Sequence, residues 1–104
     1  MSAIILAEVE IFDPSVVDEY RQLAAAAIAE FGGKYLVRSR TASPVEGDWT
    51  GETRIVLLEF SDAETAHAWY NSAAYRKARE VGQRGMNRRI AIVDAEPVAA
   101  EIRS

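Results

Sequence analysis

The stretch Thr53–Phe60, with the sequence TRIVLLEF, carries the pattern that decides the fold. In a β-strand, successive side chains point to opposite faces of the sheet. The two alternating apolar sets are Ile55 with Leu57, and Val56 with Leu58 and Phe60. This strand is therefore apolar on both faces. Helices on one side of a sheet would leave its other face in water, so the sequence raises the question of what covers the second face.

Three further segments have the alternation of strands. Residues 4–11 begin with apolar side chains on both faces and then become acidic on one. The segment Lys34–Arg40, KYLVRSR, directs Tyr35 and Val37 to one face, and its charged opposite face is typical of an edge strand. The segment Arg88–Ala95, RRIAIVDA, is the last predicted strand. In the segment Lys34–Arg40, the side chains on the face opposite to Tyr35 and Val37 are Lys34, Leu36 and Arg38.

The first helix is predicted between two of these strands. Asp13 can accept hydrogen bonds from free amides at a helix start, and Pro14 fits the first helical position. Apolar residues then recur with a helical period from Val16 to Phe31. The pair Gly32-Gly33 can adopt the left-handed conformation that ends a helix.

A second helical region follows TRIVLLEF. The motif SDAE at residues 61–64 is a capping box, in which the serine is the N-cap, and it predicts a helix to about Tyr70. The pair NS at residues 71–72 interrupts this helix. Its serine can cap a further helical piece that ends at Gly82 or Gly85.

The resulting element order is β-α-β-β-α-β, which predicts an α+β, ferredoxin-like fold with a four-stranded antiparallel sheet and helices on one face. Right-handed crossovers would put the first and third strands at the centre of the sheet. With 104 residues, we expect one domain over residues 1–95. A tail over residues 96–104 contains Pro97, and it could pair, swap or fray.

The uncovered face of this sheet would carry a contiguous apolar patch of Ile4, Leu6, Ile55 and Leu57. Such a patch usually marks an interface, and two sheets packed face to face about a two-fold axis would bury it. We therefore predict a homodimer through sheet faces, a dimeric α+β barrel. The alternative is a monomer in which long side chains such as Arg38 and Glu59 cover the patch.

Composition excludes several classes of function. The formal net charge of -4 disfavours nucleic acid as a partner. No cysteine is present, and a single histidine, His67, excludes a multi-histidine metal site within one chain, so no metal is expected. No stretch approaches the roughly 20 apolar residues of a membrane span. No nucleotide or phosphate-loop motif is seen, so we expect no cofactor. The N-terminal apolar run suits a strand better than a signal peptide, so we expect no membrane association and a cytoplasmic location.

Three motifs occur in a distinctive order and spacing: EGDW at residues 46–49, RIVLLEF at residues 54–60 and AWYNSAAY at residues 68–75. Together they resemble an uncharacterised family, domain of unknown function 1330, within the dimeric α+β barrel superfamily. The resemblance covers roughly Ala3 to Ala95 and implies the ferredoxin-like fold and the dimer. It implies no reaction, because the family is named for lacking one. The superfamily includes cofactor-free monooxygenases, haem-degrading enzymes and lactone isomerases, so the fold alone decides no activity.

A ligand site is predicted between the sheet and the helices. If the second helix runs back towards the loop of residues 41–52, its aromatic residues approach the start of the third strand. Aromatic rings and a fixed guanidinium would suit a planar or carboxylated small molecule. The predicted site residues are Trp49, Arg54, Trp69, Tyr70 and Tyr75.

Structural explanations exist for the same residues. Trp69 and Tyr70 share a helical stripe with alanines and could belong to the core. Arg54 could recognise an anion, or it could form an ion pair with Asp48 or Glu52. Two functions are thus open: small-molecule binding or cofactor-independent catalysis, and a structural or interaction module. A filled cleft would favour the second function.

Overall fold

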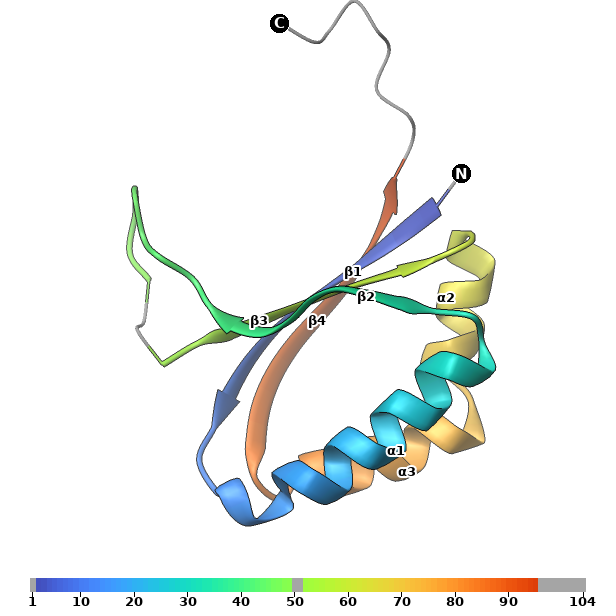
Figure 1. The fold of residues 1–104 in the computed structure, drawn as a ribbon, viewed down its shortest axis with the longest axis horizontal. Helices are drawn as coiled ribbons and strands as arrows, with labels where there is room; N and C mark the ends of the chain where they lie inside the picture. The colour runs from blue at the N-terminus through green and yellow to red at the C-terminus, as the bar shows by residue number, and fades with distance from the viewer. Residues whose placement is uncertain (1, 50–51, 96–104) are drawn as a thin grey trace, which may run out of the picture.

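A computed structural model describes residues 2–49 and 52–95 of the chain (Figure 1). The elements follow the predicted β-α-β-β-α-β order, and the second helical region is divided into two helices. They are β1 (Ser2–Ile11), η1 (Pro14–Val16), α1 (Val17–Glu30), β2 (Lys34–Thr41), β3 (Arg54–Phe60), α2 (Ala63–Tyr70), α3 (Ala73–Gly82) and β4 (Met86–Ala95).

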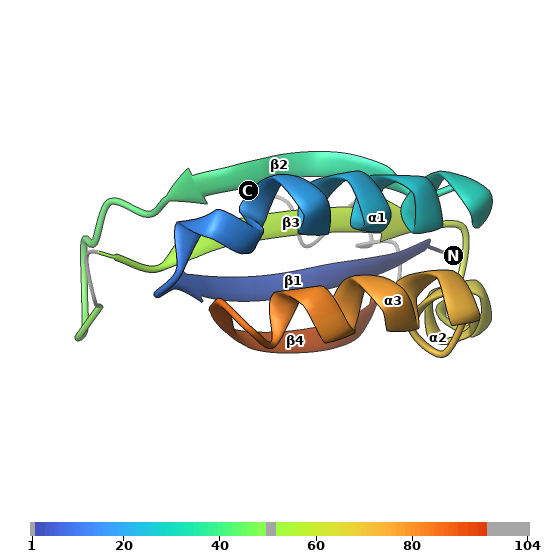
Figure 2. The same cartoon turned by 90° about the horizontal axis from the view of Figure 1, so that it is seen from below.

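The four strands form one sheet in the order β2-β3-β1-β4, and all neighbouring strands are antiparallel. The helices cover one face of this sheet (Figure 2). These features confirm the predicted α+β, ferredoxin-like fold, with β1 and β3 at the centre and β2 at an edge. The predicted tail, residues 96–104, lies outside the described residues.

The core lies between the sheet and the helices. Its largest fully buried side chains come from both layers: Ile5, Phe60, Trp69 and Tyr75. The Trp69 ring centroid lies 5.1 Å from that of Phe60 and 4.4 Å from that of Tyr75. Aromatic pairs at such separations contribute about 0.5–1.5 kcal/mol each beyond the area that they bury, so this cluster fixes α2 and α3 on the sheet.

The start and the end of the first helix are as predicted. The Asp13 carboxylate accepts a hydrogen bond of 3.0 Å from the Ser15 amide, and Pro14 begins a 3-10 turn that leads into α1. Gly32 has φ of +73°, the left-handed conformation that ends the helix. A Cβ on Gly33 would lie 2.7 Å from the Phe60 ring, so a glycine here lets the chain pass close to the core.

The cap of α2 lies one residue later than predicted. Asp62, rather than Ser61, is the N-cap, and its carboxylate accepts a hydrogen bond of 2.7 Å from the Thr65 amide. This hydrogen bond lowers the pKa of Asp62. A charged oxygen is the stronger acceptor, which explains why the aspartate replaces the neighbouring serine as the cap.

The predicted break between the two helices is present. Ser72 caps α3: its hydroxyl accepts a hydrogen bond from the Tyr75 amide and donates one of 2.7 Å to the Trp69 carbonyl. Because α2 ends at Tyr70, it stays at the end of the sheet where β3 ends, and α3 makes the return (Figures 1 and 2). The segment that follows β2 projects from the opposite end of the sheet (Figure 1).

The predicted alternation of β2 is wrong beyond Tyr35. Register shifts occur between Tyr35 and Val37 and again between Val37 and Arg40, and Ser39 has φ of +50°. Val37 pairs with Leu57 on the uncovered face of the sheet, while Arg38 shares the helix-covered side with Tyr35. A single sequence gives no signal for such a bulge, which leaves unpaired residues in one strand.

The second face of the sheet is apolar at its centre, as predicted. Leu6 lies opposite both Leu57 and Ala91, and Ile4 lies opposite Val93. Leu6 is 36% exposed and Val93 is 49% exposed. In a single chain, this central patch therefore faces solvent.

Candidate functional site

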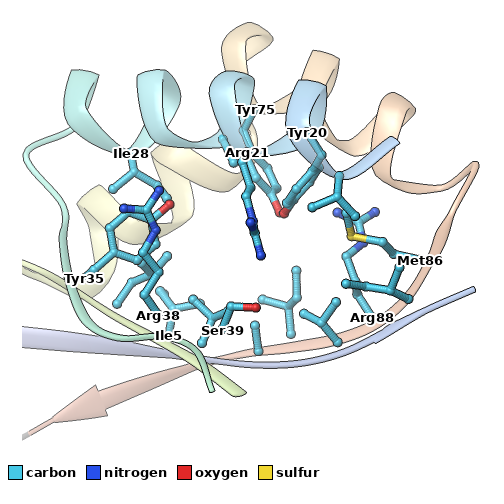
Figure 3. Close-up of a pocket in the computed structure, with 18 of the residues that line it drawn as sticks. Ile5, Tyr20, Arg21, Ile28, Tyr35, Arg38, Ser39, Tyr75, Met86 and Arg88 are labelled. Carbon is cyan, nitrogen blue, oxygen red and sulfur yellow. The ribbon is translucent and has the colours of Figure 1, made fainter. Parts of the chain in front are cut away.

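A cavity of about 80 Å³ lies between the helix-covered face of the sheet and the helices α1 and α3 (Figure 3). One ordered water needs roughly 10–15 Å³ of accessible volume, so the cavity is larger than a packing defect. It is smaller than the pockets of about 300–1,000 Å³ that enclose drug-sized ligands. Its floor is apolar and consists of Ile5, Ala7 and Val9 of β1, Val56 and Leu58 of β3, and Ile90 of β4.

Two tyrosine hydroxyls meet at the helix side of this cavity. The hydroxyl oxygens of Tyr20 on α1 and Tyr75 on α3 are 2.9 Å apart, and both residues line the cavity. Burial raises the pKa of Tyr75, and the adjacent Tyr20 raises it further. Tyr75 therefore stays protonated. When it donates its proton to the Tyr20 oxygen, the Tyr20 hydroxyl is left to donate a hydrogen bond to a molecule in the cavity.

Three arginines reach the cavity from three elements: Arg21 from α1, Arg38 from β2 and Arg88 from β4. Figure 3 shows the Arg21 side chain extending from α1 towards the sheet. None of the side chains that line the cavity is Asp or Glu, and none of the three arginines forms an ion pair within residues 2–49 and 52–95. In a protein of net charge -4, this is a local concentration of positive charge.

Two of these arginines stack on tyrosine rings. The Arg38 Cζ atom lies 4.9 Å from the centroid of Tyr35, and the Arg88 Cζ atom lies 5.3 Å from the centroid of Tyr20. Stacking holds a guanidinium in place while its edge stays open for hydrogen bonds. Burial raises the pKa of Tyr35, and the nearby charge of Arg38 lowers it by less. The Tyr35 hydroxyl therefore also stays protonated and can donate a hydrogen bond. The lining therefore combines fixed positive groups with an apolar floor.

The five predicted site residues do not converge on one place. Trp69 and Tyr75 line the cavity, whereas Tyr70 lies outside it and packs under the Arg79 guanidinium. Trp49 and Arg54 are not among the residues that line it. Ligand binding by these five residues stays a prediction, and the structure brings only two of them to the cavity.

The short length of α2 explains this separation. The Trp69 ring packs on Phe60, near the end of β3, because α2 stops after eight residues. Trp49 is 49% exposed in the segment after β2, and its indole donates a hydrogen bond of 3.0 Å to the Glu46 carbonyl. Arg54, at the start of β3, directs Nη1 to the Ser39 carbonyl at 3.5 Å. No ion pair of Arg54 with Asp48 or Glu52 is found in the part of the chain that the structure describes.

Sequence reasoning assigned only Trp69 and Tyr75 of the cavity lining to a ligand site, and it missed polar residues that include Tyr20, Arg21, Arg38 and Arg88. The position of Arg88 could have been predicted, because residues two apart in a strand share a face and Ile90 faces the helices. A charged residue at a core-facing position of a strand is a candidate for function. Arg38 carried no such signal, since its direction depends on the bulge in β2.

Two negative findings apply to the described residues. None of the helices within residues 2–49 and 52–95 has the length and the apolar character to cross a membrane. In the same ranges, no group of three or more histidine, aspartate or glutamate side chains could hold a metal ion.

The fold and the cavity define a ferredoxin-like α+β protein with an arginine-lined space between sheet and helices. The chain belongs to the domain of unknown function family DUF1330, whose sequence model matches residues 2–96. A comparison with curated proteins gave no match.

Solved structures with the same fold have very different sequences. A protein of unknown function from Rhodopseudomonas palustris, RPA0582, has a TM-score of 0.74 at 14% identity, with 93% of this chain and 84% of that chain covered. SnoaB, a cofactor-independent oxygenase from Streptomyces nogalater, has a TM-score of 0.65 at 9% identity, with 95% and 97% covered. The de novo designed protein Foldit4 has a TM-score of 0.62 at 10% identity, with 92% and 100% covered. At these identities the similarity shows the fold alone.

Proposed function

We propose that this protein binds a small organic anion with an apolar or aromatic body in the cavity between sheet and helices. The observation that carries the proposal is the composition of the lining: three arginines, no carboxylate and an apolar floor. A guanidinium can bind a carboxylate through two parallel hydrogen bonds, which orients the ligand as well as attracting it. The apolar floor would then take the body of the ligand.

The bound molecule is either a ligand that the protein carries or the substrate of a cofactor-independent reaction. SnoaB, a protein of the same fold, is described as a cofactor-independent oxygenase, which makes the second role worth testing. The Tyr20 hydroxyl is the group of this chain that could donate a hydrogen bond to an oxygen of the bound molecule.

We further propose that the protein is a homodimer through its sheet faces and acts in the cytoplasm. The exposed patch around Leu6, Leu57 and Val93 supports the dimer, and a stable interface would bury about 1,200 Å² or more in total. The absence of cysteine is compatible with a reducing compartment.

A structural or interaction module without catalysis is the second candidate. The exposed apolar patch on the sheet favours it, because this patch suits association with another protein surface. A designed protein shares the fold, so the fold by itself requires no ligand.

Native mass spectrometry of the protein from its own cells tests the first candidate. We expect a retained ligand that has an anionic group and an apolar body. In calorimetric titration with that ligand, Arg38→Gln should weaken binding by about tenfold or more, which corresponds to about 1.4 kcal/mol. Arg76→Gln is the matched control, because Arg76 is exposed on α3 and does not line the cavity.

Benzoate and its neutral analogue benzamide are the probes if no ligand is retained. Benzoate should bind more tightly than benzamide, and Arg38→Gln should remove the difference because it removes a positive charge from the lining. An uncharged natural ligand, or equal affinities of the wild type and Arg38→Gln for an anionic one, would contradict the proposal.

A further inference from the structure

A second concentration of positive charge lies on the other side of Arg88, between α3 and the edge strand β4. The Arg88 Nη2 atom donates a hydrogen bond of 3.4 Å to the Arg79 carbonyl, so the two arginines are neighbours. The Arg79 Cζ atom lies 4.7 Å from the centroid of Tyr70, and Arg88 stacks on Tyr20. Both guanidinium groups are thus held in place by aromatic rings.

Among the residues that the structure describes, neither of these arginines has a carboxylate partner. The ion pairs found within the described ranges 2–49 and 52–95 are Arg84 with Glu19 and Arg89 with Glu8. Arg79 Nε and Arg88 Nη1 are buried and have no hydrogen-bond partner in that part of the chain. Two adjacent positive charges without compensation repel each other, and a bound anion would remove this cost.

The backbone of α3 leaves room for this arrangement. A Cβ atom at Gly82 would lie 3.0 Å from Arg88 Cζ and 3.0 Å from Tyr20 Cδ1. That distance is tighter than ordinary van der Waals contact, so any larger residue would displace the guanidinium or the ring. Glycine at the last position of α3 therefore allows Arg88 to lie between the helix and Tyr20.

A hollow of about 370 Å³ opens beside the two arginines. It is lined by Tyr70, Arg79 and Gln83 on the helical side and by Asn87 and Arg88 on β4. Its lining contains no Asp or Glu within residues 2–49 and 52–95. The side-chain amides of Gln83 and Asn87 add neutral donors, although Asn87 also contacts Glu10 at 3.4 Å.

We propose that this hollow is an anion-binding site for the phosphate group of a small free metabolite. Two guanidinium groups from different elements, with amide donors beside them, match the several acceptor oxygens of a tetrahedral phosphate better than the two oxygens of a carboxylate. The site adjoins the cavity proposed above: Met86, Arg88 and Ile90 line both, whereas Tyr70, Arg79 and Gln83 line the hollow alone.

The test is a titration of the protein with inorganic phosphate, in which NMR spectra are recorded at each phosphate concentration. Chloride balances the added phosphate so that the ionic strength stays constant. We expect saturable shifts of the Arg79 and Arg88 side-chain Nε–H signals and of the Gln83 amide. Arg79→Gln should weaken phosphate binding by about tenfold or more, while Arg76→Gln should leave it unchanged. Amide spectra of both variants show whether the fold is kept.

Three results would overturn the proposal. Shifts that grow without saturation would mean general screening of charge rather than a site. Equal loss of affinity in Arg79→Gln and Arg76→Gln would mean a diffuse effect of net charge. Tighter binding of acetate than of phosphate, in a parallel titration, would assign the hollow to carboxylates instead. Each affinity is read from the Arg79 and Gln83 signals, because these residues do not line the cavity between sheet and helices, whereas Arg88 lines both sites.

Discussion

At the scale of single residues, Ser39 has the most unusual backbone next to the cavity. Its left-handed conformation belongs to the second of two register shifts in β2, between Val37 and Arg40. In a regular strand, two residues three positions apart point to opposite faces. The first shift, between Tyr35 and Val37, brings Arg38 to the same side as Tyr35 and so adds a guanidinium to the lining of the cavity.

Substitution of Ser39 should reveal the energy of that conformation. The left-handed region costs a residue with a Cβ roughly 1–2 kcal/mol, and glycine avoids this cost. We expect Ser39→Val to lower the free energy of unfolding by about 1–2 kcal/mol, and Ser39→Gly to preserve or raise it, as measured by urea denaturation. Equal stability of the valine and glycine variants would be evidence against a left-handed Ser39.

At the scale of elements, the division of the second helical region into α2 and α3 determines which aromatic residues reach the cavity. Ser72 holds this division through bonds to the Trp69 carbonyl and the Tyr75 amide. Tyr75 lies in the first turn of α3, the helix that returns along the sheet, and its hydroxyl meets that of Tyr20 at the cavity.

Removal of this cap tests its contribution to stability. An N-cap serine changed to alanine typically costs about 1 kcal/mol, so Ser72→Ala should lower the free energy of unfolding by about that amount. Ser61→Ala is the control: Ser61 is exposed and is not the cap of α2, so its effect should stay within about 0.5 kcal/mol. If urea denaturation showed a larger loss of stability for Ser61→Ala than for Ser72→Ala, the assigned caps would be wrong.

The sequence was sufficient for the elements but not for the site. Alternation, caps and glycine pairs are local signals, and they predicted the strands, the helix break and the sheet order. The cavity depends on residues far apart in the chain, such as Tyr20 and Tyr75, whose contact has no local signal. The expected approach of Trp69 to Trp49 assumed a continuous second helix, although the break was itself predicted from Ser72.

At the scale of the whole molecule, the main feature is the apolar patch on the open face of the sheet, which faces solvent in a single chain. Leu6, Leu57 and Ala91 lie side by side across three strands. Apolar residues at the centre of a sheet are costly to expose, which motivates the proposed homodimer.

A charge at the centre of this patch should disrupt the dimer. Leu57→Arg would bury an unpaired guanidinium in the proposed interface, so we expect monomers or an unfolded protein in sedimentation velocity experiments. Val45→Arg adds the same charge at a residue that is 98% exposed, and this control should keep the oligomeric state of the wild type. An unaltered dimer with normal helicity in Leu57→Arg would contradict packing through the sheet faces.

The irregularity of β2 also affects how the molecule avoids aggregation. The sheet has two edges, β2 and β4, and an exposed edge can template the addition of strands from other chains. Register shifts and a left-handed residue interrupt the free edge of β2, whereas β4 pairs with β1 in register over its full length. Any intermolecular strand addition should therefore occur along β4, where Arg88 and Arg89 place positive charge.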